Sequence, residues 1–243
     1  MELYIIRHAQ STNNVSMIYN STDRVADPPL TELGFRQAET VAHYLSTTHD
    51  IDRWVDQIPE SNQLPHGFNF TKLYCSPMLR TLQTCLPISR KLNMEAEVWV
   101  DLHEHGGIHL DYGDVRGVVG FPGLGRTAIQ DQFTGFHVPP LITDDGWYNP
   151  AHKAEDIATC MGRAVRVAHA IRQHTSTNER IALVTHGTFT DVLLKSLLNM
   201  LPNHTMRFSH YNTAITRLDF SPDGHVKLRY LNRIAHLPPD MVS

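Results

Sequence analysis

The chain has 243 residues, enough to bury a large core in one large domain or two small ones. Its apolar share of 41% and its charged share of 19% are ordinary for a soluble globular protein. The formal net charge is −4 and the lysines and arginines form no run, which argues against a nucleic-acid-binding protein. An anionic ligand would therefore need a local cluster of cations.

The cysteines and the lengths of the apolar runs indicate the cellular compartment in which the protein is expected. The three cysteines, Cys75, Cys85 and Cys160, form no closely spaced pair and are odd in number. We expect them to be buried, reduced thiols. Met1 leads directly into an expected strand without a charged and then apolar leader, and no apolar run reaches membrane-spanning length. These features predict a cytoplasmic protein without membrane contact.

The first expected strand, residues 2–7, leads directly into Arg7 and His8. Side chains at the carboxyl end of a parallel strand emerge where α/β sheets bind ligands. A guanidinium can bind phosphoryl oxygens, and a neutral imidazole beside it can attack the phosphorus. Taken alone, the pair is more typical of an edge strand that ends in two solvated residues, so the rest of the chain has to decide.

The next segments alternate between helix and strand. An amphipathic helix is expected over residues 31–46, with Thr31 as its N-cap. A strand at residues 71–75 is followed by Ser76-Pro77, which places a proline at an early helical position, as helix starts prefer. Pro87 is expected to kink or shorten that helix.

Residues 105–150, which follow a third expected strand at 96–100, break the alternation. They contain nine of the 14 glycines and several aromatic residues, namely Tyr112, Phe121, Phe133, Phe136 and Trp147. A loop this long is usually functional or disordered, and its aromatic content disfavours disorder. We expect a lid whose aromatic residues, with Arg116 or Arg126, define the substrate. A structural cover or a contact in a homo-oligomer is the alternative.

Alternation resumes after this insertion. A helix is expected at 153–174, a strand at 180–184, a helix at 188–199 and a hairpin of strands at 213–220 and 225–231. Strands that alternate with helices imply a largely parallel sheet covered on both faces. The expected fold is therefore one α/β domain over the whole chain, a three-layer α/β/α sandwich with a mostly parallel central sheet.

Polar residues follow four of the expected strands. Arg7-His8 ends the first, Ser76 to Thr84 follows the second, Asp101 to Glu104 follows the third, and Thr185-His186-Gly187 follows the fourth. Because the carboxyl ends of parallel strands share one edge of a sheet, the fold would gather these groups at a single site.

These segments resemble the histidine phosphatase superfamily, in its phosphoglycerate mutase-like branch. The resemblance covers most of residues 1–231, except the polar stretch 49–70 and the insertion. It is carried by four segments, Arg7-His8-Ala9-Gln10-Ser11-Thr12-Asn13-Asn14, Leu30-Thr31-x-x-Gly34-x-x-Gln37-Ala38, Ser76-Pro77-x-x-Arg80-x-x-Gln83-Thr84 and Val184-Thr185-His186-Gly187. Their order and spacing imply the phosphoglycerate mutase-like fold.

The resemblance also implies roles for individual residues. His8 would be the nucleophile that takes the phosphoryl group as a phosphohistidine. Arg7, Arg80 and His186 would bind the phosphoryl oxygens, with His186 counted among the catalytic residues, and Asn14 matches a further position of the phosphate pocket. The neighbouring cations should lower the pKa of His8 and keep its ring neutral and nucleophilic.

Glu104 matches the general acid of the family. It would protonate the leaving alcohol oxygen and then deprotonate the water that attacks the phosphohistidine. Asp101 is the competing candidate. We prefer Glu104 because it lies nearer the resembling position and its side chain reaches further.

A metal site is the alternative interpretation of one histidine-rich cluster, which consists of His103, Glu104, His105, His109 and Asp111. Imidazole and carboxylate are normal zinc ligands. However, the chain has 16 histidines, so chance clusters are common, and no close cysteine pair accompanies this one. We expect neither a metal nor an organic cofactor.

The expected function is the hydrolysis of a phosphomonoester, with a small phosphorylated molecule as substrate and inorganic phosphate as product. The mutase subgroup carries Glu-Arg-His-Tyr-Gly around its acid, whereas this chain reads His103-Glu104-His105-Gly106-Gly107, which disfavours a mutase. A mutase-type phosphoryl transfer and a non-catalytic phospholigand-binding protein remain the alternatives.

Overall fold

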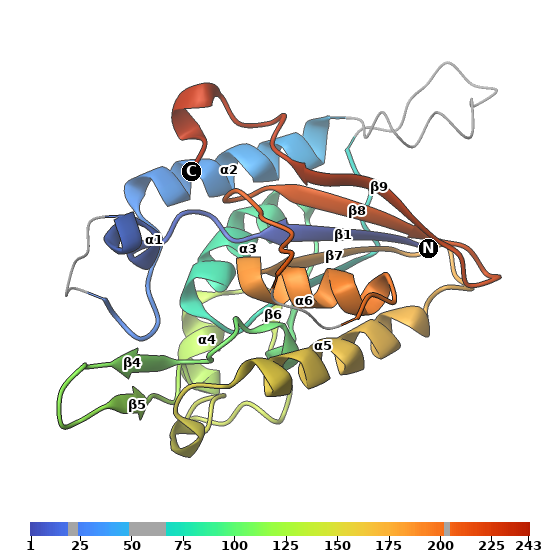
Figure 1. Cartoon of the computed structure of the whole chain (residues 1–243). Coiled ribbons are helices and arrows are strands. Elements are labelled where there is room, and N and C mark those ends of the chain that lie inside the picture. The colour runs from blue at the N-terminus through green and yellow to red at the C-terminus, as the bar shows by residue number, and fades with distance from the viewer. Residues whose placement is uncertain (19–23, 49–66, 202–204) are drawn as a thin grey trace, which may run out of the picture.

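The computed structural model describes residues 1–18, 24–48, 67–201 and 205–243. Its central element is a seven-stranded sheet with the strand order β6-β3-β2-β7-β1-β8-β9 (Figure 1). The strands are β1 (Glu2–Arg7), β2 (Lys72–Cys75), β3 (Ala96–Val98), β6 (Phe136–His137), β7 (Arg180–Thr185), β8 (Ile215–Phe220) and β9 (Val226–Arg233). Most of the expected surface stretch 49–70 lies outside the described residues.

The sheet is mostly parallel, as predicted. β1 pairs in parallel with β7, β7 with β2, β2 with β3 and β3 with β6. Only the C-terminal hairpin is antiparallel, because β8 pairs with both β1 and β9 in that sense. The carboxyl ends of the parallel strands therefore meet at one edge of the sheet.

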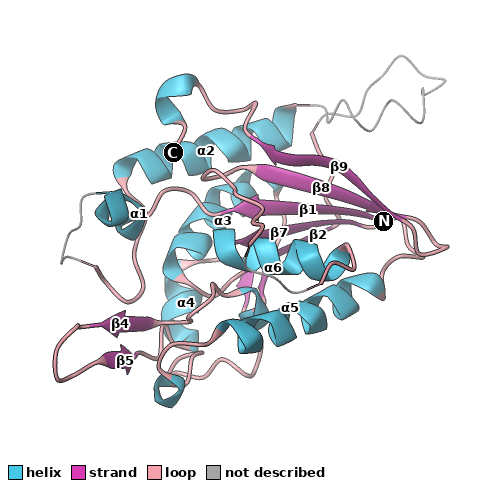
Figure 2. Ribbon diagram, in the orientation of Figure 1, coloured by secondary structure: helices cyan, strands magenta, loops and turns pink. Residues whose placement is uncertain are grey.

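Helices cover both faces of this sheet (Figure 2). They are α1 (Thr12–Ile18), α2 (Glu32–Thr47), α3 (Leu79–Leu92), α4 (Arg126–Gln132), α5 (Ile157–Arg172) and α6 (Gly187–Leu197). Successive strand residues point to opposite faces, so Tyr4 and Ile6 of β1 join the core under α2 and α3. Leu3 and Ile5 join the second core, under α5 and α6. This is the expected three-layer α/β/α arrangement.

Local boundaries follow capping chemistry. The hydroxyl of Thr31 accepts a hydrogen bond from the Gly34 N–H at 3.0 Å, which confirms the predicted N-cap of α2. The prediction for the start of α3 was wrong, because the helix begins at Leu79, after Pro77. Pro87 does not shorten the helix, which continues to Leu92. A proline removes one intrahelical hydrogen bond, but here Cys85 and Ile88 on either side of it are fully buried and hold the helix in place.

Two segments expected to be irregular contain regular structure. The polar stretch after Arg7-His8 includes the helix α1. The insertion holds α4, β6 and a two-stranded sheet of β4 (His109–Asp111) and β5 (Val118–Gly120). Its aromatic side chains Phe133, Phe136 and Trp147 are buried in the core under α2 and α3. They stabilise the packing of the insertion, which is why they do not line the substrate cleft described below.

The three cysteines are buried and unpaired, as expected. No helix in the described part of the chain combines the length and the apolar character that crossing a bilayer requires.

Candidate active site

Backbone pairing at the carboxyl edge of the sheet brings three of the predicted segments together. The His8 N–H donates to the Thr185 carbonyl at 2.8 Å, and the Ser76 N–H donates to the Val184 carbonyl at 3.1 Å. The segments that leave β1, β2 and β7 therefore start side by side. This proximity depends on the order of the strands in the sheet and not on the local sequence of any one segment.

His8 is 3% exposed and held in one orientation. Its Nδ1–H donates to the Ala9 carbonyl at 2.7 Å, and its Nε2 accepts from Nε of Arg80 at 3.2 Å. In the neutral ring the Nδ1 proton leaves the lone pair on Nε2. Burial, with Arg80 and Arg7 adding to it, holds the pKa of His8 well below its usual range. The ring is therefore neutral, and its Nε2 lone pair faces a cation.

His186 lies against His8, with the two ring centroids 5.1 Å apart. Its Nε2 is hydrogen-bonded to the Ser76 hydroxyl at 2.8 Å, and its buried Nδ1 has no hydrogen-bond partner among the described residues. Burial and the charge of Arg80 hold the pKa of His186 well below its usual range. The side chain is 0% exposed, so it lies behind His8 and does not itself line the cleft.

Two guanidiniums flank His8. Arg7 donates from Nη1 to the His210 carbonyl, while its buried Nε has no hydrogen-bond partner in the described part of the chain. A methyl group on Gly187 would lie 3.4 Å from that Nε, in ordinary van der Waals contact. Arg80 lies 3.9 Å from a carboxylate oxygen of Asp27. The arrangement leaves donors free to bind an oxyanion.

Asn14, in the first turn of α1, also faces the cleft. Its side-chain carbonyl accepts from the backbone N–H and the hydroxyl of Ser11, at 2.9 and 3.0 Å. Nearby, the Asn212 side chain donates to the His8 carbonyl at 2.9 Å. Asn212, at the start of the C-terminal hairpin, thus holds the backbone of His8.

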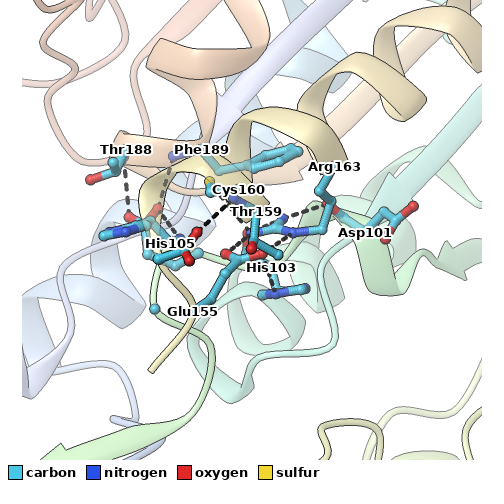
Figure 3. Close-up of polar contacts among 12 residues, drawn as sticks. Asp101, His103, His105, Glu155, Thr159, Cys160, Arg163, Thr188 and Phe189 are labelled. Atoms are coloured by element: carbon cyan, nitrogen blue, oxygen red, sulfur yellow. Dashed lines mark hydrogen bonds and ion pairs between the residues drawn. The ribbon is translucent and has the colours of Figure 1, made fainter. Parts of the chain in front are cut away.

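Glu104 lies at the N-terminus of α6, next to Thr188 and Phe189, which Figure 3 labels. Its carboxylate accepts from the backbone N–H groups of Thr188, Phe189 and His105, at 3.2, 2.8 and 2.9 Å. It lines the cleft that His8 lines, whereas Asp101 does not. The Asp101 carboxylate lies 3.3 Å from the exposed Arg166. Of the two acid candidates, only Glu104 therefore lines the same cleft as His8.

A buried arginine of α5 holds the segment that carries Glu104 (Figure 3). Arg163, 2% exposed, donates to the carbonyls of Asp101 and His103, both at 2.7 Å. It also makes a bidentate pair with Glu155 at 3.0 and 2.5 Å. Burial, with the charge of Arg163 adding to it, lowers the pKa of His103 to about 3. This network was not predicted, because no local pattern links α5 to residues 101–104.

Asp27 is a second residue of the site that the sequence analysis missed. Its carboxylate accepts from the Leu79 N–H, the first of α3, at 3.0 Å and lies next to Arg80. Burial raises the pKa of Asp27 to about 6, although the Arg80 charge acts in the opposite direction. The only sequence signal was its place just before Pro28-Pro29, shortly before the resembling segment that begins at Leu30.

These groups line a cleft of about 560 Å³. Arg7, His8, Asn14, Arg80 and Glu104 all contribute to it. From the insertion, His105, Gly107 and His109 reach the cleft.

The predicted specificity arginines of the insertion do not line the cleft. Arg116 forms a 2.6 Å ion pair with Asp114, and Arg126 donates to the carbonyls of Ile142 and Pro139. Two other arginines line it instead, Arg24 and Arg207. Among the described residues no three His, Cys, Asp or Glu side chains are grouped as metal ligands.

Comparison with known proteins agrees with this geometry. The family model described as "Histidine phosphatase superfamily (branch 1)" matches residues 3–55 and 57–233. No curated protein matches the chain.

Solved structures share the fold at low sequence identity. A phosphoserine phosphatase from Entamoeba histolytica, in complex with 3-phosphoglyceric acid, is 21% identical, with a TM-score of 0.57 over 98% of this chain and 99% of its own. YhfR from Bacillus stearothermophilus is 18% identical, with a TM-score of 0.61 over 97% and 98% of the two chains. An alpha-ribazole phosphatase from Shigella flexneri is 16% identical, with a TM-score of 0.59 over 96% of each chain.

Proposed function

Because the chain belongs to the histidine phosphatase superfamily (branch 1), we propose that it hydrolyses a phosphomonoester through a phosphohistidine on His8. The observation that carries the proposal is the state of His8. Its ring is neutral, its proton is on Nδ1, and its Nε2 lone pair lies 3.2 Å from a guanidinium nitrogen in a cleft that also holds Glu104. Solved structures of the same fold include phosphatases with small phosphorylated ligands, phosphoserine among them.

In the first half-reaction the Nε2 lone pair of His8 forms a bond to phosphorus. The bond between phosphorus and the ester oxygen breaks, and its electron pair stays on the alcohol oxygen, which takes a proton from Glu104. Arg7 and Arg80 bind the transferred oxygens, whose negative charge is spread over three atoms in the transition state. The side-chain amide of Asn14, which lines the cleft, supplies a further donor.

In the second half-reaction water replaces the alcohol. Glu104, now ionised, takes a proton from that water, whose oxygen attacks the phosphorus. The bond from phosphorus to Nε2 breaks, its electrons return to His8, and inorganic phosphate leaves. The three backbone N–H groups that hold the Glu104 carboxylate fix its position for both proton transfers.

The proposal is tested by assaying phosphomonoesters, p-nitrophenyl phosphate first, with wild-type protein and His8→Ala in the presence of a chelator. We expect the variant to lose activity by a factor on the order of 10⁴ or more, because alanine lacks the Nε2 that would attack phosphorus. Rapid quenching with a ³²P-labelled ester should trap an acid-labile, alkali-stable phosphoenzyme in the wild type and none in the variant. Full activity in His8→Ala would remove the mechanism.

A matched pair of variants in the same assay tests whether Glu104 or Asp101 is the general acid. Glu104→Gln should lose activity by roughly 10²- to 10⁴-fold. The amide keeps one oxygen to accept from the N–H groups of α6, so the fold is retained. Asp101→Asn should stay within a few-fold of the wild type, and a larger loss there would reverse the assignment.

Release of phosphate to water, without transfer to a second hydroxyl of the substrate, separates hydrolysis from a mutase reaction.

A further inference from the structure

Arg24 and Arg207 form a second pair of cations in the cleft. Both line it and both are exposed. They come from different parts of the chain, Arg24 from the segment after α1 and Arg207 from the segment after α6. Arg24 is near enough to Arg80 for its charge to lower the pKa of Arg80, behind the larger effect of burial.

No ion pair or hydrogen bond within the described residues accounts for the position of either arginine side chain. Within the described residues, neither side chain forms an ion pair or a hydrogen bond with another residue. The carboxylates that line the cleft are already engaged. Glu104 accepts three backbone N–H groups, and Asp191 pairs with Lys195 at 2.8 Å and accepts from the Phe208 N–H at 2.9 Å.

The cleft therefore holds more positive charge than the binding of one phosphate needs. Arg7 and Arg80 flank the nucleophile and suffice for a phosphomonoester dianion. Arg24 and Arg207 add two further positive charges to the same concave surface, although the whole chain carries a net charge of −4. An isolated exposed arginine is ordinary, but two unpaired ones lining the cleft beside a phosphate site are an anion-binding arrangement.

We propose that Arg24 and Arg207 bind a second anionic group on the alcohol part of the substrate, so that the preferred esters are phosphomonoesters that also carry a carboxylate or a second phosphate. This inference rests on the proposed function and adds a substrate class to it. The volume of about 560 Å³ is in the range of small-molecule sites, and it accommodates a second charged group beyond the phosphate.

The test compares esters that differ only in the second anion. Glycerol 3-phosphate and 3-phosphoglycerate differ by a hydroxymethyl group in place of a carboxylate. Propane-1,3-diol monophosphate and its bisphosphate differ by a phosphate. With the wild-type protein we expect the ester with the second anion to have a kcat/KM about tenfold higher than its partner ester, in at least one of the two pairs. A factor of about ten corresponds to the free energy of one charge-assisted hydrogen bond. The pair that shows the preference identifies the second anion as carboxylate or phosphate.

Variants connect the preference to the two arginines. Arg24→Gln and Arg207→Gln should each reduce the ratio of kcat/KM within the pair, mainly through KM, and the double variant should bring it near one. Arg116→Gln is the matched control, because that exposed arginine lies outside the cleft lining and pairs with Asp114. It should keep the wild-type ratio.

Failure of the subsite and failure of the proposed function give different results. If p-nitrophenyl phosphate is hydrolysed but neither ester pair shows a preference, or if the preference survives in the double variant, the subsite is wrong and the phosphatase proposal stands. Calorimetric titration of His8→Ala protein with the same esters measures the preference without turnover. If no ester is hydrolysed, this titration still decides the subsite.

Discussion

The two buried imidazoles of the site owe their neutral state to their surroundings. Burial removes water that would stabilise an imidazolium, and the guanidiniums of Arg80 and Arg7 oppose a further positive charge, so the pKa of His8 lies well below its usual range. A neutral ring keeps its Nε2 lone pair available. The same burial would be costly for an arginine without an anion, which suits a site that binds phosphate.

Asp27 makes the stability of the protein depend on pH. Its pKa is raised from 3.8 to about 6, chiefly by burial. Between these two values the folded protein keeps a proton that the unfolded chain has lost. The contribution of Asp27 to the free energy of unfolding is therefore greatest at low pH, decreases as the pH rises through this window, and becomes constant above about pH 6.

We predict that Asp27→Asn removes this pH dependence. Between about pH 4.5 and pH 7, the stability of the wild type relative to the variant should fall by about 2 kcal/mol, because the amide cannot ionise. Urea denaturation of both proteins across this range measures the difference. Glu39→Gln, at an exposed position of α2, is the control. A stability difference that does not vary with pH would contradict the raised pKa.

At the scale of elements, α5 and α6 jointly position Glu104, the proposed general acid. The N-terminus of α6 binds the Glu104 carboxylate, and Arg163 of α5 holds the carbonyls of the preceding residues. The guanidinium also lies 4.5 Å from the Phe189 ring, so the two helices and the loop form one packed unit.

We predict that Arg163→Met destabilises the protein by about 3 to 5 kcal/mol, because Glu155 would be left buried without its partner. The double variant Arg163→Met/Glu155→Gln should lose less than the sum of the single variants. Both quantities come from urea denaturation, and kcat should fall as Glu104 loses its support.

Arg166→Met is the matched control on the same helix. Its exposed guanidinium contacts only the Asp101 carboxylate, at 3.3 Å, among the contacts seen in the described residues. A cost below about 1 kcal/mol is expected there. Equal costs at the two positions would show that the network around Arg163 does not hold the loop.

At the scale of the whole molecule, the charge is unevenly distributed. The chain carries a net charge of −4, yet four guanidiniums line one cleft, those of Arg7, Arg24, Arg80 and Arg207. Such a local field attracts anions to the site despite the negative total.

We predict that kcat/KM for a dianionic ester falls by roughly three- to tenfold when NaCl is raised from about 0.02 M to about 0.3 M, because the Debye length shortens. The value of kcat should change less, since salt screens buried charges such as that of Arg80 much less than exposed ones. Steady-state kinetics at fixed pH measures both. A kcat/KM that is flat or rises with salt would show that the cleft does not steer its substrate.

Much of the fold and the inner site could be predicted from the chain alone. Apolar runs, caps and turn residues are local signals, and they placed β1, α2, β7 and the C-terminal hairpin within a few residues. The order of the parallel strands then brought His8, Arg80 and His186 to one edge. The lid role expected for residues 105–150 stays a prediction.

The remaining features depend on contacts between residues far apart in the chain. Asp27 meets the start of α3, Arg163 meets the carbonyl of Asp101, and Arg24 and Arg207 line the same cleft. Phe133, Phe136 and Trp147 of the insertion lie in the core because burying their large apolar surface is more favourable than exposing it at a cleft. Local patterns decide which segments are strands and which polar groups end them. Which distant side chain supports each of those groups is decided only by packing.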